Sequence, residues 1–134
     1  NSKQAESQFG EKWVLREINK AYSGFIQPEE ENGRRVATGK WGCGVFKGNP
    51  QLKFIIQWLA ASRANRDIVF YTYKDETSFN SEETQKVLKH YIGKEVGELF
   101  KDLMKAAREM QMSSSNTGDE NKNLFRVLIK NKKL

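Results

Sequence analysis

Apolar residues near the start of the chain follow a helical period. Five of them lie at helical spacing: Val14, Ile18, Ala21, Tyr22 and Phe25. Gly24 offers a stop, because glycine is a weak helix former and a common residue at helix ends. The pattern therefore predicts a first helix that runs to about Ser23. The segment that follows, QPEEENG at 27–33, combines proline, glycine and adjacent acids, which is typical of an exposed loop.

A second helix is predicted to begin after Asn49, since asparagine caps helices and Pro50 suits the first helical position. Its apolar stripe comprises Leu52, Ile55, Ile56, Leu59 and Ala60. The short segment before it, RRVAT at 34–38, is compatible with a strand. The segment after it, DIVFYTY at 67–73, is too continuously apolar to alternate, as expected of a strand covered on both faces. The order predicts a βαβ unit with parallel strands and a right-handed crossover.

The last third of the chain predicts helices and a polar segment. One amphipathic stripe, which we interpret as core packing, comprises Val96, Leu99, Phe100, Leu103, Met104 and Ala107. The polar run SSSNTGDENKN at 113–123 is interpreted as a mobile linker. It leads to LFRVLIKNKKL, a final strand or helix with a basic tail that is either a solvated end or a contact for a polyanion.

Composition narrows the class of protein. The chain has 134 residues, about one domain, with 37% hydrophobic and 30% charged residues and a formal net charge of +6, which favours an anionic partner without requiring one. A single cysteine excludes an internal disulfide framework, and no apolar run is long enough to cross a membrane. The polar start does not resemble a signal peptide, so we expect a soluble intracellular protein of the nucleus or cytoplasm. The absence of an initiating methionine suggests a trimmed or fragmentary chain.

The stretch from Ala37 to Asn49 reads ATGKWGCGVFKGN and contains four glycines. A glycine loop between a strand and a helix N-terminus presents backbone N–H groups and the positive end of a helix dipole to an anion, typically a phosphate. Alternatively, the glycines could be needed only because a tight connection between a strand and a helix requires backbone dihedral angles that other residues rarely adopt. Common phosphate motifs do not fit, because Gly48 lacks the following Lys and Ser/Thr of a P-loop and GCGVFKG has one residue too many for a dinucleotide fingerprint.

Four segments together resemble the C-terminal part of the catalytic domain of the poly(ADP-ribose) glycohydrolase family: REINKAYSGF, VATGKWGCGVFKGNPQLK, IIQWLAA and RDIVFYTY. The family's central motif reads approximately TGNWGCGAFGGD, and most of its positions are kept here in order and without gaps. The resemblance spans about Trp13 to Lys74, roughly half of the chain.

This resemblance implies an α/β fold in which a macrodomain-like mixed sheet lies between helices. The chain would supply a strand-loop-helix-strand unit and C-terminal helices, with 1–134 as the C-terminal portion of one such domain. In the family, the glycine loop wraps the diphosphate of a terminal ADP-ribose unit. Carried over, the backbone N–H donors are Gly42, Cys43, Gly44, Val45 and Phe46.

Further site residues follow from the same resemblance. The Phe46 ring would also lie against a ribose, and Tyr73 stands where the family usually has a phenylalanine beside the adenine. Three positions depart from the family: Lys40 replaces Asn, Lys47 replaces Gly and Asn49 replaces Asp. Lys40 either makes a charge-assisted contact to phosphate or points to solvent and weakens the site.

The chemistry of the family needs residues that this chain lacks. The family's catalytic loop, three glycines followed by adjacent glutamates, normally lies upstream of the matched region. The paired acids of this chain, Glu29 to Glu31 and Glu82 with Glu83, follow no triple glycine, so neither pair is assigned a catalytic role. His90 has no metal-ligand partner at a suitable spacing, Cys43 has no histidine partner, and no cofactor or metal is expected.

The sequence therefore predicts hydrolysis of ribose–ribose bonds in poly(ADP-ribose), with this chain supplying the diphosphate-binding loop and part of the adenine pocket. The expected partners are poly(ADP-ribose), ADP-ribose, poly-ADP-ribosylated proteins and an upstream part of the same protein, with no membrane. The chain alone is expected to be inactive. The alternatives are a non-catalytic ADP-ribose reader and, further off, a basic nucleic-acid-binding domain.

Overall fold

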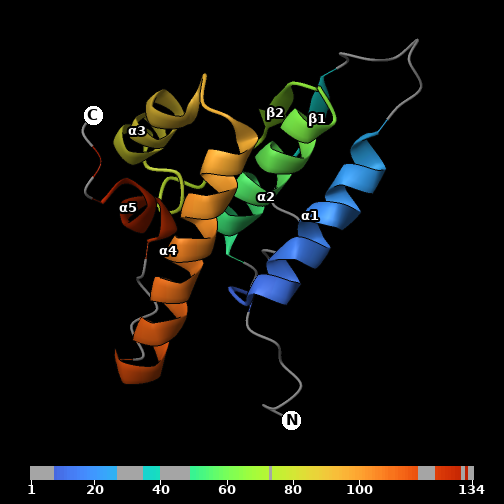
Figure 1. Ribbon diagram of the computed structural model, residues 1–134. Helices are drawn as coiled ribbons and strands as arrows, with labels where there is room; N and C mark the ends of the chain where they lie inside the picture. The colour runs from blue at the N-terminus through green and yellow to red at the C-terminus, as the bar shows by residue number, and fades with distance from the viewer. Residues whose placement is uncertain are drawn as a thin grey trace.

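The computed structural model describes residues 8–26, 35–39, 49–72, 74–117, 123–130 and 132, without the side chains of 113–117. In chain order the elements are α1 (Glu11–Phe25), β1 (Val36–Thr38), α2 (Pro50–Arg63), β2 (Ile68–Phe70), α3 (Ser81–Tyr91), α4 (Val96–Thr117) and α5 (Leu124–Ile129). Figure 1 shows the two strands together near one end of α2, with α1 on one side of that helix and α3, α4 and α5 on the other.

The predicted βαβ arrangement of parallel strands is confirmed. β1 and β2 pair in parallel, with Val36 opposite Ile68 and Thr38 opposite Phe70, and α2 connects them. The prediction that the second strand is covered on both faces is wrong for the described residues, because all three residues of β2 are only half-buried. The continuous apolar run therefore reflects β propensity and partial burial rather than a strand enclosed between two layers.

The first helix extends slightly further than predicted. It includes Gly24 and ends at Phe25, whose side chain is buried. A Cβ at Gly24 would meet no atom within 4 Å, so this glycine serves no close packing and does not stop the helix. Arg66 donates from its guanidinium to the carbonyl oxygens of Phe25 (3.1 Å) and Arg35 (3.3 Å), which ties the end of α1 to the start of β1.

Helix α2 is the centre of the described fold. Its predicted stripe is buried, and so are several residues outside that stripe, including Gln51, Lys53 and Gln57. The reason is that α2 contacts α1, α4, α5 and β2, so it is enclosed on more than one face. A helix in that position buries polar side chains along with apolar ones, and each of them needs a partner.

Aromatic rings join α2 to the elements around its first turns. Phe54 lies 5.1 Å from Phe70 of β2, 6.2 Å from Phe79 and 6.1 Å from Phe125 of α5, in edge-to-face arrangements, and 5.6 Å from Trp58. Offset and edge-to-face pairs at these separations are favourable beyond the area that they bury. The rings therefore connect the second strand and the last helix through one side chain of α2.

The C-terminal helices follow the predicted pattern with two differences. In α4 the buried residues include Leu99, Leu103, Met104 and Ala107, whereas Val96 is 37% exposed. The helix continues to Thr117, so the first five residues of the predicted linker, 113–117, are helical; 118–122 lie outside the described residues. The final segment, predicted as strand or helix, forms the helix α5. No helix in the described ranges is long and apolar enough to span a membrane.

Candidate functional site

The predicted ligand-binding residues lie outside the described residues. These are Lys40, Gly42, Cys43, Gly44, Val45, Phe46 and Tyr73. The residues that flank them are described: Gly39 precedes Lys40, Asn49 follows Gly48, and Thr72 precedes Tyr73. These flanks bound the candidate site along the chain.

The two strands bring the first and last of these flanks to one edge of the sheet. Because β1 and β2 run in parallel, their carboxyl ends point the same way. The amide of Tyr71 donates to the carbonyl oxygen of Thr38 at 2.8 Å, so the pairing continues one step beyond β2. The chain leaves this edge toward Lys40 from β1 and toward Tyr73 from β2. In open α/β sheets, ligands bind outside the carboxyl ends of the strands.

The third flank is the N-terminus of α2. The side-chain oxygen of Asn49 accepts a hydrogen bond from the amide of Leu52 at 3.0 Å, which confirms the predicted N-cap, and Pro50 occupies the first helical position. The amide of Asn49 donates to the side-chain oxygen of Gln8 at 2.7 Å. The first turn of α2 carries no acidic residue. The partial positive charge of this helix end is therefore not offset by an adjacent carboxylate in that turn.

A residue that the sequence pattern did not single out contacts the first of these flanks. Gln57 is fully buried in α2, and its amide nitrogen donates to the carbonyl oxygen of Gly39 at 2.9 Å. Its amide oxygen accepts from the hydroxyl of Thr38 at 2.5 Å. The sequence did contain a signal for this role, because Gln57 interrupts the apolar run FIIQWLAA. Burying a polar side chain without hydrogen-bond partners costs free energy, so a glutamine at this position indicates buried partners.

A buried cation, Lys53, lies one helical turn before Gln57 in α2. The ammonium of Lys53 contacts Glu17 of α1 at 2.9 Å and lies 4.8 Å from the centre of the Trp13 ring. Partial burial raises the pKa of Glu17, but the hydrogen bonds and charges of Lys53 and Lys20 outweigh it and leave that pKa below its usual value. The charge of Lys53 is thus compensated within the helix pair rather than offered to a ligand.

The comparisons with known proteins decide the family. Residues 1–80 match the model of a family described as "Poly (ADP-ribose) glycohydrolase (PARG), Macro domain fold". The chain belongs to this family. Its fold is accordingly α/β of the macro domain type, to which the described residues contribute the parallel strand pair and the surrounding helices.

Several curated relatives of the family are similar over part of their length. Poly(ADP-ribose) glycohydrolase 1 of Arabidopsis thaliana is 35% identical over 103 residues, which is 75% of this chain and 18% of the relative. A probable poly(ADP-ribose) glycohydrolase 2 of the same plant is 38% identical over 137 aligned residues, 72% of this chain and 26% of the relative. Poly(ADP-ribose) glycohydrolase 2 of Caenorhabditis elegans is 34% identical over 65% of this chain. The chain thus spans about a fifth to a quarter of the length of the two plant relatives.

Among the described acids of this family member, the pair at the start of α3 is engaged in structural contacts. Glu82 and Glu83 lie in the first turn, where Asn80 caps both of their amides, at 3.0 and 3.3 Å. The Glu83 carboxylate accepts from Asn123 at 2.7 Å and pairs with Arg126 at 2.5 Å, which joins α3 to α5. The other acidic run, Glu29 to Glu31, lies outside the described residues.

Among the described residues there is no group of three or more His, Cys, Asp or Glu side chains that could hold a metal ion. His90 instead stacks edge-on against Tyr91, with the ring centres 4.6 Å apart. Cys43 lies outside the described residues.

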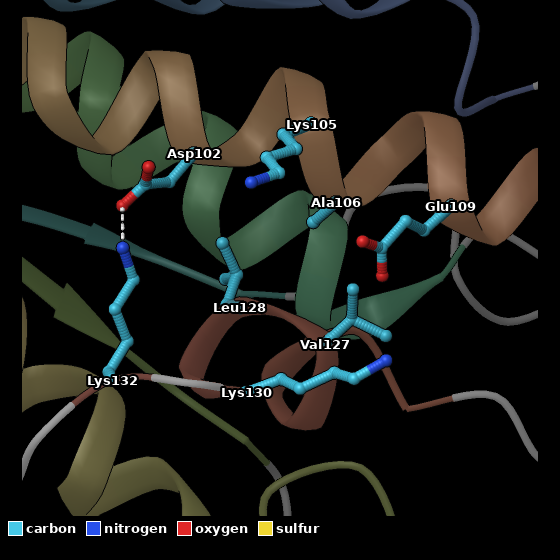
Figure 2. A pocket seen from close by; sticks show the side chains of 8 residues that line it. All are labelled: Asp102, Lys105, Ala106, Glu109, Val127, Leu128, Lys130 and Lys132. Carbon is cyan, nitrogen blue, oxygen red and sulfur yellow. Dashed lines mark ion pairs between the residues drawn. The ribbon is translucent and has the colours of Figure 1, made fainter.

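Several hollows border the C-terminal helices in the described part of the chain. A cleft of about 450 Å³ beside β2 is lined by Phe54, Trp58, Phe70 and Thr72, among others, and it reaches the flank of Tyr73 through Thr72. A second hollow of about 280 Å³ lies between α4 and the C-terminal segment and is lined by Lys105, Glu109 and Lys130, among others (Figure 2). Neither α4 nor α5 carries a flank of the glycine stretch, so this second hollow is separate from the candidate site.

An ion pair lies at one side of the second hollow (Figure 2). Lys132 reaches Asp102 at 3.0 Å (Figure 2). The hydroxyl of Tyr91 donates to the same carboxylate at 2.6 Å. Burial raises the pKa of Asp102, but the hydrogen bonds from Tyr91 and Lys132 outweigh it and leave the pKa below its usual value. Burial and the Asp102 carboxylate both raise the pKa of Tyr91. The basic end of the chain is thus tied to α4 by at least this one lysine.

Proposed function

We propose that the protein hydrolyses ribose–ribose glycosidic bonds in poly(ADP-ribose), with this chain supplying the loop that binds the diphosphate of a terminal ADP-ribose. In this proposal Gly42, Cys43, Gly44, Val45 and Phe46 donate backbone N–H groups. Tyr73 lies beside the adenine, and Lys40 lies next to the phosphates. The substrate is carried by poly-ADP-ribosylated proteins of the nucleus or cytoplasm.

The observation that carries the proposal is the family match over residues 1–80, which includes the whole glycine stretch. The described flanks support it. The bond between Tyr71 and Thr38 puts the chain segments that lead to Lys40 and Tyr73 at one sheet edge, and the capped N-terminus of α2 follows the loop. Backbone N–H groups at such a position bind phosphate oxygens well. The largely apolar cleft that includes Thr72 offers surface for an adenine ring.

The general acid of the reaction is assigned to a segment outside this chain. Glycosidic bond cleavage needs a carboxylic acid that protonates the departing oxygen. The Glu83 carboxylate is instead engaged by Arg126 and Asn123, which join α3 to α5. The chain by itself is therefore expected to bind the ligand without hydrolysing it.

The second candidate function is a reader that binds ADP-ribose and has no hydrolase activity. It rests on the same glycine stretch, which lies within the family match over residues 1–80. The two candidates share the diphosphate loop and differ only in the acid, so binding tests the loop and hydrolysis tells the candidates apart.

The test is calorimetric titration of the full-length protein with ADP-ribose, together with release of ADP-ribose from poly(ADP-ribose). Gly44→Val should abolish binding, because a branched side chain would stand where the ligand's oxygens approach the backbone. Tyr73→Ala should weaken the binding of ADP-ribose more than the binding of ribose phosphate, since only ADP-ribose has an adenine that can stack on the tyrosine ring.

The matched control is Gly24→Val, because Gly24 is in a helix and a Cβ there meets nothing within 4 Å. If Gly44→Val binds ADP-ribose with unchanged affinity, the assignment of the glycine stretch as the diphosphate-binding loop is refuted. Equal losses for both ligands in Tyr73→Ala would place that residue in the core instead. Binding by the wild-type protein without hydrolysis would favour the reader.

A further inference from the structure

We propose that Gln57 is a positioning residue that fixes the start of the glycine-rich loop against α2 and so prepares the loop for its ligand. The inference rests on the proposed function for the ligand's identity, an ADP-ribose diphosphate. It concerns a residue that would touch no ligand atom itself.

The contacts of Gln57 join two successive residues at the end of β1. The amide nitrogen donates to the carbonyl of Gly39 at 2.9 Å, and the amide oxygen accepts from the Thr38 hydroxyl at 2.5 Å. Gly39 is the last described residue before the stretch 40–48. One buried side chain thus holds the two residues from which the loop departs.

The chemistry of this position requires an amide. A carboxamide can donate to a carbonyl and accept from a hydroxyl at the same time, which neither an aliphatic side chain nor an ionised carboxylate can do. Gln57 has no exposed surface and stands between Ile56 and Trp58 in an apolar run of α2, where an aliphatic residue would serve packing equally well. Both polar atoms of the Gln57 amide form hydrogen bonds to the two residues before the loop. The need to hold these residues therefore explains why the position carries an amide, whereas core packing alone does not.

A fixed starting point matters because the loop is rich in glycine. The stretch from Gly39 to Gly48 contains four glycines, the residue type that loses most conformational freedom when it is ordered. Ordering that is already complete in the free protein need not be repeated on binding, so anchoring favours affinity. Releasing the backbone of about one residue should weaken ligand binding by about tenfold.

The experiment compares Gln57→Met with Gln51→Met in the full-length protein. Both substitutions keep the approximate volume of the side chain. Gln51 is also buried in α2 and also makes two hydrogen bonds, but to Ser78 and Phe125, which do not belong to the loop. The two variants should therefore lose comparable stability for different reasons. ADP-ribose affinity is measured by calorimetry at a temperature at which each variant is fully folded.

The expected result is an affinity about tenfold weaker in Gln57→Met and within about twofold of wild type in Gln51→Met. Amide hydrogen exchange over 39–48 in the free protein should become faster in Gln57→Met alone, which a general loss of stability would not produce. If Gln57→Met does not fold, Thr38→Val serves in its place. It removes only the hydroxyl contact and should weaken binding by about threefold.

The remaining outcomes separate this inference from the proposed function. Equal losses of affinity in the two methionine variants, or wild-type affinity in Gln57→Met, would overturn the positioning role while leaving the diphosphate loop intact. If the wild-type protein does not bind ADP-ribose, the proposed function fails. The exchange measurement then decides the positioning role alone: faster exchange over 39–48 only in Gln57→Met supports it, and unchanged exchange overturns it.

Discussion

Replacing Gln51 by methionine should destabilise the protein strongly, because this side chain joins three parts of the fold. Its amide nitrogen donates to the Ser78 carbonyl at 2.6 Å, and its oxygen accepts from the amide of Phe125 at 3.0 Å. Phe125 is fully buried, so its N–H would lose its partner without gaining water. That loss costs about 1–3 kcal/mol, and the bond to the half-buried Ser78 adds about 1 kcal/mol.

The free energy of unfolding should therefore fall by about 2–4 kcal/mol, which corresponds to a decrease in melting temperature of about 10 °C for a chain of this size. Urea unfolding followed by circular dichroism measures the change, with an unaltered m value as the sign that only stability has changed. Gln85→Met is the matched control, because Gln85 is exposed on α3 and should change stability by less than about 0.5 kcal/mol. The reasoning is refuted if Gln51→Met costs no more than this control.

Two further predictions concern a helix cap and a pH dependence. Asn49→Ala should lose about 1 kcal/mol of stability in urea unfolding, whereas Asn49→Asp should lose almost none, since only alanine cannot accept from the Leu52 amide; equal losses would contradict the capping role. The pKa of Asp102 in the folded protein lies below its ordinary value of 3.8. Between these two pKa values the unfolded state binds more protons than the folded state, so the stability of the protein decreases as the pH is lowered. The advantage of wild type over Asp102→Asn should be complete above about pH 5 and shrink below about pH 4, and an advantage that persists unchanged at pH 3 would argue against the ion pair.

The elements that the sequence predicted well are those set by local rules. The cap at Asn49, the proline at the next position and the apolar stripe of α2 all act within one or two helical turns. The parallel pairing of β1 and β2 also follows from local order, since a strand, a helix and a strand in succession leave few ways to pack.

The features that were missed depend on distant partners. The half-buried state of β2 depends on what covers the sheet, which no pattern within the strand reveals. The helical residues 113–117 read as polar linker because their composition favours loops. The role of Gln57 was hidden for the same reason: its partners, Thr38 and Gly39, lie 19 and 18 residues away in the sequence.

The C-terminal helices support α2, the helix that follows the glycine stretch, although the family match ends at residue 80. α2 follows the loop directly and carries Gln57, so any movement of this helix moves both ends of the loop. Its position is fixed in part by α5, through the bond from Phe125 to Gln51 and the ring contact between Phe125 and Phe54. Because both ends of the loop move together with α2, substitutions in the last helix should lower stability and leave ligand affinity within about twofold of wild type.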